Sequence, residues 1–173
     1  LFPYTTLFRS YPIYFDGTIG QAKRHLENTA KMIRQKFPEI SAYVSVNKAL
    51  VTQASAAIPI VPLYFAILYK VMKKEGNHEG CIEQIARLFK EKLSKEVVSV
   101  DNEGRIRMDD WELSDKVQQQ VISAWEQVTT ENVAEISDIE GYWEDFYRMF
   151  GFHFPEVDYE KDVEIDIKIP SIE

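Results

Sequence analysis

One run of apolar residues constrains the fold of this 173-residue chain more than any other feature. Residues 55–72 read S-A-A-I-P-I-V-P-L-Y-F-A-I-L-Y-K-V-M and are apolar nearly all round a helix. A bilayer-spanning helix needs about 20 apolar residues, whereas this run is shorter and contains Pro59, Pro62 and Lys70. Proline is tolerated in the first turn of a helix, where its missing N–H has no partner to lose. The run therefore predicts a buried helix with prolines near its start.

Two elements that precede this run indicate an α/β arrangement. After Asp16, Gly17 and Thr18, apolar residues recur at spacings of three and four, which predicts an amphipathic helix that ends before Pro38. The apolar face of this helix comprises Ile19, Ala22, Leu26, Ala30, Ile33 and Phe37. Residues 43–51 alternate and then close on an apolar run, as a largely buried strand does. Helix, strand and buried helix in succession are typical of one half of an α/β unit.

The chain beyond Gly76 is predicted to begin with a helix and a small hairpin. The helix covers residues 79–93, and one of its faces carries Ile82, Ile85, Ala86, Phe89 and Leu93. Residues 97–100 and 105–108 flank the turn sequence D-N-E-G and predict two antiparallel strands.

Two further helices and a tail complete the predicted elements. Ser114 is expected to cap a helix whose apolar face carries Val117, Val121, Ile122, Trp125 and Val128. Residues 138–150 predict a helix rich in aromatic side chains, Tyr142 among them. Residues 157–169 alternate apolar and charged side chains, which fits either an edge strand or a segment lying over the surface.

Composition excludes several classes of function. The net charge of −8 argues against a nucleic-acid partner, because phosphate binding requires clustered lysine and arginine. The single cysteine, Cys81, excludes an internal disulfide and fits a reducing compartment, so we expect a cytoplasmic protein. His25, His78 and His153 lie far apart without ligands at metal spacing, and we therefore expect no metal site.

The first ten residues, L-F-P-Y-T-T-L-F-R-S, look foreign to the protein. They are the in-frame translation of the common sequencing-library adapter CTC-TTT-CCC-TAC-ACG-ACG-CTC-TTC-CGA-TCT. They also lack the positively charged start of a signal peptide. Our hypothesis is that the native sequence within this chain begins near Ser10 or Tyr11.

Tyr14 and Lys23 bracket the turn that opens the first predicted helix. Nine residues along one helix would turn the two side chains to opposite faces, so they can meet only if Tyr14 precedes the helix and the chain bends at Gly17. An ammonium group lowers the cost of negative charge on a phenol oxygen or on a substrate oxygen beside it. On spacing alone, a buried tyrosine and an unrelated surface lysine remain the default interpretation.

Longer motifs around this pair resemble one family. The run Y-P-I-Y-F-D-G-T-I-G-Q-A-K-R-H-L-E, residues 11–27, is similar to the active-site segment of the trans-2-enoyl-CoA reductases, which include the FabV-type enoyl-acyl-carrier-protein reductases. Residues 44–59, 62–72, 74–84 and 105–113 resemble further family segments in the same order. The resemblance covers essentially everything after Ser10.

The resemblance implies an α/β fold, namely the C-terminal part of a Rossmann-like reductase. This part is expected to be mostly helical, with one central parallel strand and a small hairpin. Residues 11–173 then form the C-terminal portion of the catalytic domain, with residues 138–173 as its extension. The implied reaction is the NADH-dependent reduction of the C2=C3 double bond of a trans-2-enoyl thioester, carried by CoA or by acyl-carrier protein, in fatty acid synthesis.

The resemblance also implies roles for individual residues. Tyr14 matches the catalytic tyrosine, which hydrogen-bonds the thioester oxygen as it becomes an enolate and serves as proton donor. Lys23 matches the lysine that contacts the cofactor ribose and supports the tyrosine. The remaining matches are the cofactor-contacting residues Leu50, Val51 and Thr52 and the substrate-side residues Tyr69 and Tyr142. For Leu50, Val51 and Tyr69, simple core packing is the alternative interpretation.

The sequence contains no glycine-rich turn of the kind that binds the phosphates of a dinucleotide. We therefore expect this polypeptide alone neither to bind NADH tightly nor to turn over. A non-catalytic helical interaction module derived from the reductase fold is the alternative function. Residues 44–55 and 77–84 look closer to CoA-ester reductases than to carrier-protein reductases. We favour a monomer, and nothing in these residues indicates a flavin site.

Overall fold

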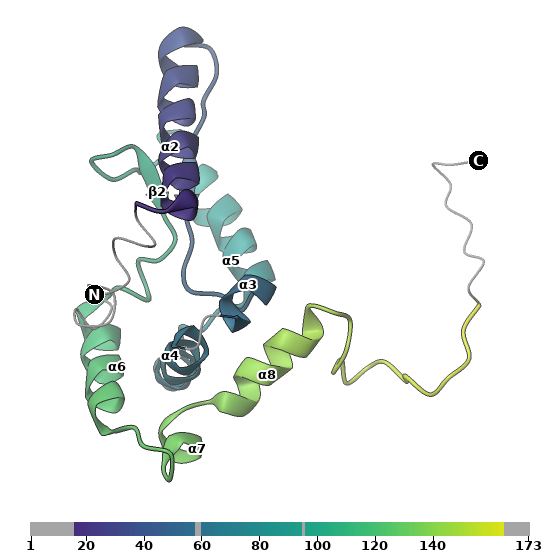
Figure 1. Ribbon diagram of the computed structural model, residues 1–173. Helices are drawn as coiled ribbons and strands as arrows, with labels where there is room; N and C mark the ends of the chain where they lie inside the picture. The colour runs from purple at the N-terminus through teal and green to yellow at the C-terminus, as the bar shows by residue number, and fades with distance from the viewer. Residues whose placement is uncertain (1–15, 58–59, 95, 165–173) are drawn as a thin grey trace.

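The computed structural model describes residues 16–57, 60–94 and 96–164. Within these ranges the chain is mostly helical and carries one small sheet, as the sequence predicted (Figure 1). Its elements, in chain order, are α2 (Thr18–Lys36), β1 (Val44–Val46), α3 (Gln53–Ala56), α4 (Val61–Glu75), α5 (Cys81–Arg87), the π-helix η1 (Leu88–Leu93), β2 (Arg105–Arg107), α6 (Asp115–Gln127), α7 (Val133–Ile136) and α8 (Ile139–Arg148).

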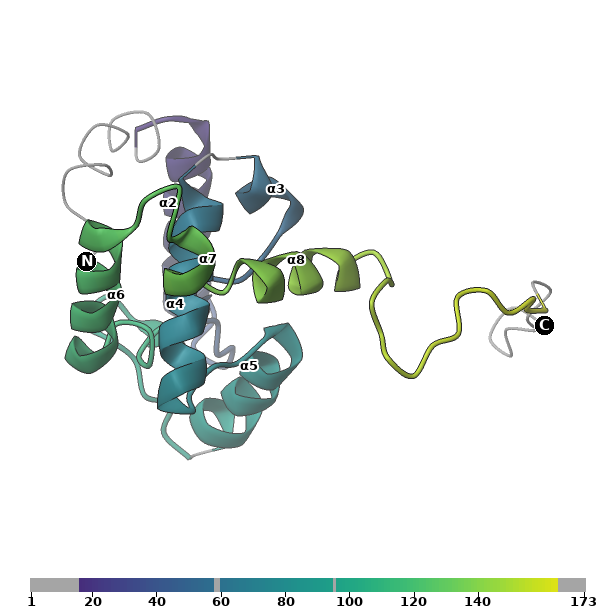
Figure 2. The ribbon, with the colours of Figure 1, turned by 90° about the horizontal axis from the view of Figure 1, so that it is seen from below.

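Helix α4 is the centre of the packed core, which confirms the prediction of a buried helix. Helices α6 and α8 pack against it from two sides (Figures 1 and 2). Pro62 lies in its first turn, and Gly76 ends it in the left-handed conformation with φ of 72°. Its buried side chains are Tyr64, Phe65, Ala66, Ile67, Leu68, Tyr69, Val71 and Met72. None of the helices in the described ranges is both long and apolar enough to cross a bilayer.

The apolar run does not begin as one continuous helix. Its first residues belong to α3, a separate short helix that opens at Thr52 with a capping box formed with Ser55. Pro59 and Pro62 each lack an N–H donor, so an uninterrupted helix across both would lose two backbone hydrogen bonds. Residues 58–59 lie outside the described ranges.

The two strands pair in parallel, so the predicted hairpin is wrong. Val44 faces Arg105 in the register, and the Met108 N–H continues the ladder by donating to the Val46 carbonyl at 2.9 Å. The Asp101 carboxylate accepts the Arg105 N–H at 3.0 Å and the Arg105 guanidinium at 2.9 Å, which closes a tight turn before β2. Residues 97–100 carry no strand. The predicted strand over residues 43–51 is real but shorter, and its last part is a connection to α3 that is neither helix nor strand.

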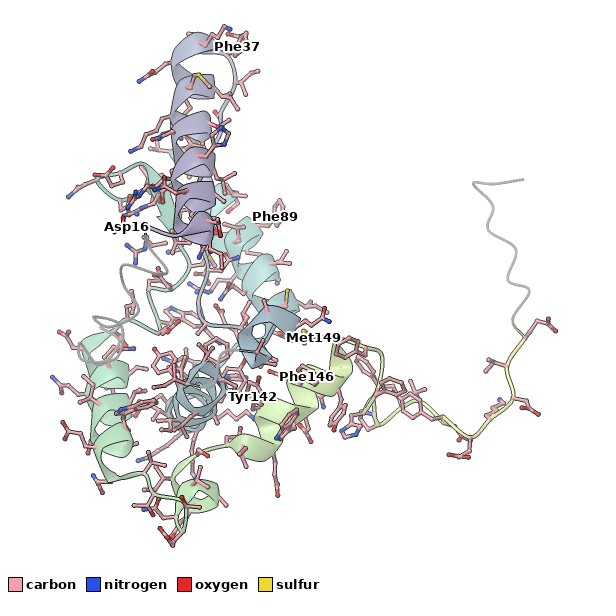
Figure 3. The ribbon with its side chains drawn as sticks, in the orientation of Figure 1. Asp16, Phe37, Phe89, Tyr142, Phe146 and Met149 are labelled. Atoms are coloured by element: carbon pink, nitrogen blue, oxygen red, sulfur yellow. The ribbon has the colours of Figure 1, made fainter. Side chains whose placement is uncertain are left out.

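Helix α2 has the predicted extent but does not bury the predicted face. Ala30 is buried, whereas Ile19 and Leu26 are more than half exposed, and Phe37 lies at the far end of the helix (Figure 3). The helix contacts the sheet region through polar groups, including the pair between Lys31 and Glu103 at 2.7 Å.

Helix α5 is also turned differently from the prediction. Ile82 is 78% exposed and Phe89 is 61% exposed, while Arg87 is buried. The Arg87 guanidinium donates to both carboxylate oxygens of Glu79 and to the Met108 carbonyl at 2.7–2.8 Å, and it lies 4.0 Å from the Trp111 ring centroid. This buried arginine fixes the inner face of α5, so the apolar residues of the helix lie outside.

Helices α6 and α8 were both predicted from the sequence, and in the structure they pack against α4. Ser114 precedes α6 in an extended conformation, and Val117 and Val121 are buried against the core. Asp138 begins α8 by accepting the Gly141 N–H at 3.1 Å. The short helix α7 was not predicted. Residues 149–164 leave the helices without forming a helix or strand, and residues 165–173 lie outside the described ranges (Figures 1 and 2).

Candidate active site

Of the predicted catalytic pair, the structure describes only Lys23. Lys23 is exposed in the second turn of α2, as predicted. Tyr14 lies outside the described residues, so the meeting of its hydroxyl with the Lys23 ammonium stays a prediction. Gly17 precedes α2 with an extended backbone (φ −76°, ψ −178°). The helix therefore begins at Thr18, directly after the predicted turn.

The segment predicted to touch the cofactor connects β1 to α3. The Thr52 Oγ accepts the Ser55 N–H at 3.1 Å, and the Ser55 Oγ accepts the Thr52 N–H at 2.9 Å. The Thr52 hydroxyl is therefore used as a helix cap. Val51 is buried, whereas Leu50 is half-buried. The Leu50 N–H and C=O have no hydrogen-bond partner among the described residues.

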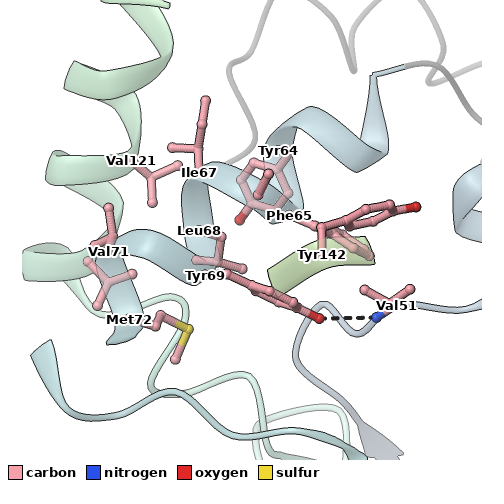
Figure 4. Packing of buried hydrophobic residues seen from close by; sticks show 12 residues of the cluster. Val51, Tyr64, Phe65, Ile67, Leu68, Tyr69, Val71, Met72, Val121 and Tyr142 are labelled. Atoms are coloured by element: carbon pink, nitrogen blue, oxygen red, sulfur yellow. Dashed lines mark hydrogen bonds between the residues drawn. The ribbon is translucent and has the colours of Figure 1, made fainter. Parts of the chain in front are cut away.

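Tyr69 holds this segment through its hydroxyl. Its oxygen accepts the Val51 N–H at 3.2 Å, and the ring is almost fully buried in the core cluster (Figure 4). Burial raises the pKa of Tyr69, and the nearby Asp145 charge raises it further. Tyr69 is thus both a core residue and a hydrogen-bond partner of the predicted cofactor segment.

Tyr142 joins the same cluster from α8. Figure 4 shows its ring beside Phe65 and close to Val51. The Tyr142 Oη is buried and has no hydrogen-bond partner among the described residues. Burial raises the pKa of Tyr142, and the Ser55 hydroxyl lies near enough to oppose this without meeting hydrogen-bond geometry. The structure therefore brings Val51, Tyr69 and Tyr142 together, although they are far apart in sequence.

Lys48 is a buried neighbour of Tyr69 that the sequence did not single out. Its Nζ lies 4.9 Å from the centroid of the Tyr69 ring and donates to the Ala49 carbonyl at 2.9 Å. Burial lowers the pKa of Lys48 to about 8, and the Glu112 carboxylate partly opposes that shift. A lysine in the motif N-K-A-L-V is ordinarily solvated, so only the structure reveals this environment.

His78 also packs against the Tyr69 ring. The two rings meet edge to face with centroids 4.5 Å apart, and the His78 Nδ1 is buried without a partner among the described residues. Burial, aided by the charge of Lys48, lowers the pKa of His78 to about 4. Burial raises the pKa of Asp145 on α8. In the sequence we considered His78 as a metal ligand and did not anticipate this contact.

Comparison with known proteins gives this arrangement a family context. A family model described as the trans-2-enoyl-CoA reductase catalytic region matches residues 1–94, and a model described as the enoyl reductase FAD binding domain matches residues 100–163. The enoyl-acyl-carrier-protein reductase (NADH) of Coxiella burnetii is 54% identical over 94% of this chain and 41% of its own length. The trans-2-enoyl-CoA reductase of Euglena gracilis is 51% identical over 94% of this chain and 30% of its own length.

Solved structures agree with the sequence matches. The trans-2-enoyl-CoA reductase of Clostridium acetobutulicum in complex with NADH superposes with a TM-score of 0.81 at 51% identity, covering 90% of this chain and 40% of that protein. The enzyme of Treponema denticola in complex with NAD gives a TM-score of 0.82 at 51% identity, covering 89% and 39%. The predicted family and fold class are confirmed, apart from the hairpin. The chain spans about two fifths of the length of the Coxiella burnetii relative.

Around β2 and the start of α6, the residues that match the FAD binding model offer no open site for a flavin pyrophosphate. A pyrophosphate needs cations or helix N-termini that are not already neutralised. Arg105 and Arg107 are paired with Asp101 and Asp109, and α6 begins with the acidic Asp115. Across the described ranges, no three histidine, cysteine or acidic side chains are grouped as metal ligands either.

Proposed function

The chain belongs to the trans-2-enoyl-CoA reductase family, and we propose on that basis that it is the C-terminal part of an NADH-dependent enoyl thioester reductase. The reaction is the reduction of the C2=C3 double bond of a trans-2-enoyl thioester to the saturated acyl thioester. The matched relatives are longer, so the complete enzyme includes residues beyond this chain. Exposed apolar side chains on α2 and α5 support a role within a larger fold, because soluble proteins seldom leave such faces uncovered.

The observation that best supports the proposal is the segment at the carboxyl end of β1, residues 50–52, which Tyr69 holds through the Val51 N–H. Ligands of open α/β folds bind beyond the carboxyl ends of parallel strands. Here the Val51 N–H is occupied by Tyr69, while the Leu50 N–H and C=O have no partner among the residues that the structure describes. These two backbone groups are suited to hydrogen-bond a carboxamide, so the segment fits the nicotinamide end of NADH. NADH, when bound, supplies the hydride that reaches C3 of the substrate.

Tyr14 and Lys23 act on the thioester oxygen in this proposal. The Tyr14 hydroxyl hydrogen-bonds the oxygen that gains negative charge and provides a proton, while the exposed Lys23 ammonium binds the cofactor ribose and favours the charged state. The support is the position of Lys23 in the second turn of α2, just after the bend at Gly17.

Tyr142 and Tyr69 lie on the substrate side in this proposal. The Tyr142 hydroxyl is free to donate to a bound acyl thioester, because no described residue accepts from it. Tyr69 contributes only its ring to the substrate side, since its oxygen is already used by Val51. Tyr142 is therefore the better candidate for a polar substrate contact.

A full-length chimera tests the proposal. Residues 11–173 replace the matching segment of the Coxiella burnetii reductase, and NADH oxidation is followed with crotonyl-CoA and with the same acyl group on acyl-carrier protein. We expect turnover with at least one thioester, more rapidly with the CoA ester, and a monomeric enzyme by light scattering. The 173-residue chain alone is expected to show none. A folded chimera that oxidises NADH with neither thioester, beside an active unmodified relative, would refute the proposal.

The location proposed for the complete enzyme is the cytosol. The described residues include one cysteine, Cys81, which is exposed and unpaired. An exposed thiol is compatible with a reducing compartment.

A further inference from the structure

A buried carboxylate hydrogen-bonds the backbone next to the segment that is predicted to touch the cofactor, residues 50–52. Glu112 is 5% exposed and lies in the loop between β2 and α6. One of its oxygens accepts the Ala49 N–H at 2.7 Å, and the other accepts the Tyr64 hydroxyl at 2.7 Å. Gln118 supports the same loop by donating to the Glu112 carbonyl at 2.8 Å. Glu112 therefore links the β1–α3 connection to α4 and α6.

The hydrogen bonds to this connection are two residues apart. Glu112 takes the Ala49 N–H, and Tyr69 takes the Val51 N–H. The segment is thus held at Ala49 and at Val51, while the Leu50 N–H and C=O between them have no hydrogen-bond partner among the described residues.

The chemistry of the site explains why the residue is a carboxylate. Both groups that face the Glu112 side chain are donors, a backbone N–H and a phenol O–H. An ionised carboxylate offers only acceptors, whereas an amide presents one donor as well. Burying a carboxylate is unfavourable unless its oxygens are hydrogen-bonded. The Glu112 side chain is therefore stable in this position only when both donors stay within hydrogen-bond distance.

We propose that Glu112, together with Tyr69, is a positioning residue that fixes the backbone of residues 49–51 so that the free groups of Leu50 are presented to the nicotinamide. This inference rests on the proposed function. Glu112 does not touch substrate or cofactor in this account and acts only through the Ala49 peptide.

Kinetics of the full-length chimera test the role. Replacing Glu112 with methionine, which removes both acceptors, should raise KM for NADH about ten-fold, because a backbone N–H that has lost a charge-assisted partner is no longer fixed. The change in kcat should stay within about three-fold, since the reacting groups are elsewhere. Tyr69→Phe should raise the same KM while leaving the packed ring in place.

Two variants serve as matched controls. Glu112→Gln keeps an acceptor for the Ala49 N–H and should restore KM to within about three-fold of the unmodified chimera. Tyr147→Phe removes a phenol hydroxyl from the half-exposed face of α8 and should change neither parameter. Equal increases in KM for Glu112→Gln and Glu112→Met would overturn the hydrogen-bond role, as would an unchanged KM in both Glu112→Met and Tyr69→Phe.

Amide hydrogen exchange in the 173-residue chain separates this inference from the proposed function, because it needs no activity. Glu112→Met should lose protection at the Ala49 amide and keep it at Val51, whereas Tyr69→Phe should show the reverse. If the chimera is inactive but this crossed pattern is found, the proposed function fails and the anchoring stands. Unchanged protection at Ala49 and Val51 in the two variants would refute the anchoring itself.

Discussion

Replacing Tyr142 with phenylalanine removes one buried hydroxyl and leaves the packed ring in place. The Tyr142 residue is 2% exposed, and its oxygen has no hydrogen-bond partner in the part of the chain that the structure describes. A buried polar group without a partner costs about 1–3 kcal/mol, so its removal should stabilise the protein. Because the Ser55 hydroxyl lies nearby, we expect the lower end of this range, a gain of about 1 kcal/mol.

Tyr64 provides the matched comparison, because its hydroxyl is also buried but has a hydrogen-bond partner. The Tyr64 hydroxyl donates to the Glu112 carboxylate at 2.7 Å in an equally buried site. Hydrogen bonds to charged groups contribute about 1.5–3 kcal/mol, so Tyr64→Phe should destabilise the chain by that amount. The two substitutions delete identical atoms and are predicted to change the free energy of unfolding with opposite signs.

Urea unfolding of the 173-residue chain, followed by tryptophan fluorescence, measures both effects. The slope of the unfolding free energy against urea concentration, the m value, should be unchanged in both variants. In thermal unfolding, the Tm of Tyr142→Phe should rise by roughly 2–4 °C. In the full-length chimera the same variant should raise KM for crotonyl-CoA, since the proposal assigns the hydroxyl to the substrate. Destabilisation of Tyr142→Phe by as much as Tyr64→Phe would show that the Tyr142 hydroxyl has a structural partner, and the reasoning would be wrong.

Three further outcomes are expected from urea unfolding of variants. Lys48 has a pKa of about 8 when folded and 10.5 when unfolded, so at this residue the unfolded chain binds more protons between these values, and the contribution of Lys48 to stability should rise with pH across that window. Lys48→Met should abolish this rise, which amounts to about 3 kcal/mol, and an identical slope in both proteins would contradict it. Gly76→Ala should cost about 1 kcal/mol, because Gly76 has φ of 72° while a Cβ there meets no atom within 4 Å; an unchanged midpoint would show that this left-handed cap is not needed. Arg87→Met should cost about 3–5 kcal/mol by leaving the Glu79 carboxylate buried and unpaired, and a loss below 1 kcal/mol would exclude that pairing as the anchor of α5.

Much of the helical fold follows from local pattern. The apolar run at residues 61–72 has no hydrophilic face to expose, so it had to be the buried helix α4. The turn before Thr18 and the position of Ser114 marked the starts of α2 and α6 in the same way, although Ser114 makes no capping hydrogen bond and its hydroxyl donates to the Trp111 carbonyl instead. These signals depend only on neighbours a few residues away.

The sheet depended on contacts that local pattern does not contain. Residues 97–108 read as a hairpin because two short apolar segments flank a turn sequence. The structure pairs Arg105–Arg107 with Val44–Val46, about sixty residues earlier, and leaves Val97 exposed. A pairing over that separation is decided by the packing of the intervening helices.

The orientation of α5 and the residues that support the candidate site could not be predicted from the sequence for a related reason. Arg87, Glu112 and Lys48 look like solvated charges in sequence, yet each is buried with defined partners. The resemblance located Val51, Tyr69 and Tyr142, and the structure brings these three together. Residues 105–113 resemble a family segment, but the resemblance implied no role for Glu112 within it.

The pairing of Tyr14 with Lys23 is the central claim, and one substitution tests it most directly. In the full-length chimera, Tyr14→Phe should lower kcat for crotonyl-CoA reduction by about 10²–10³-fold, the effect of losing one donor to a developing oxyanion. KM for NADH should stay near that of the unmodified chimera, and Tyr147→Phe should leave kcat unchanged. A fall in kcat of less than about three-fold on removing the Tyr14 hydroxyl would contradict its role as the donor to the thioester oxygen.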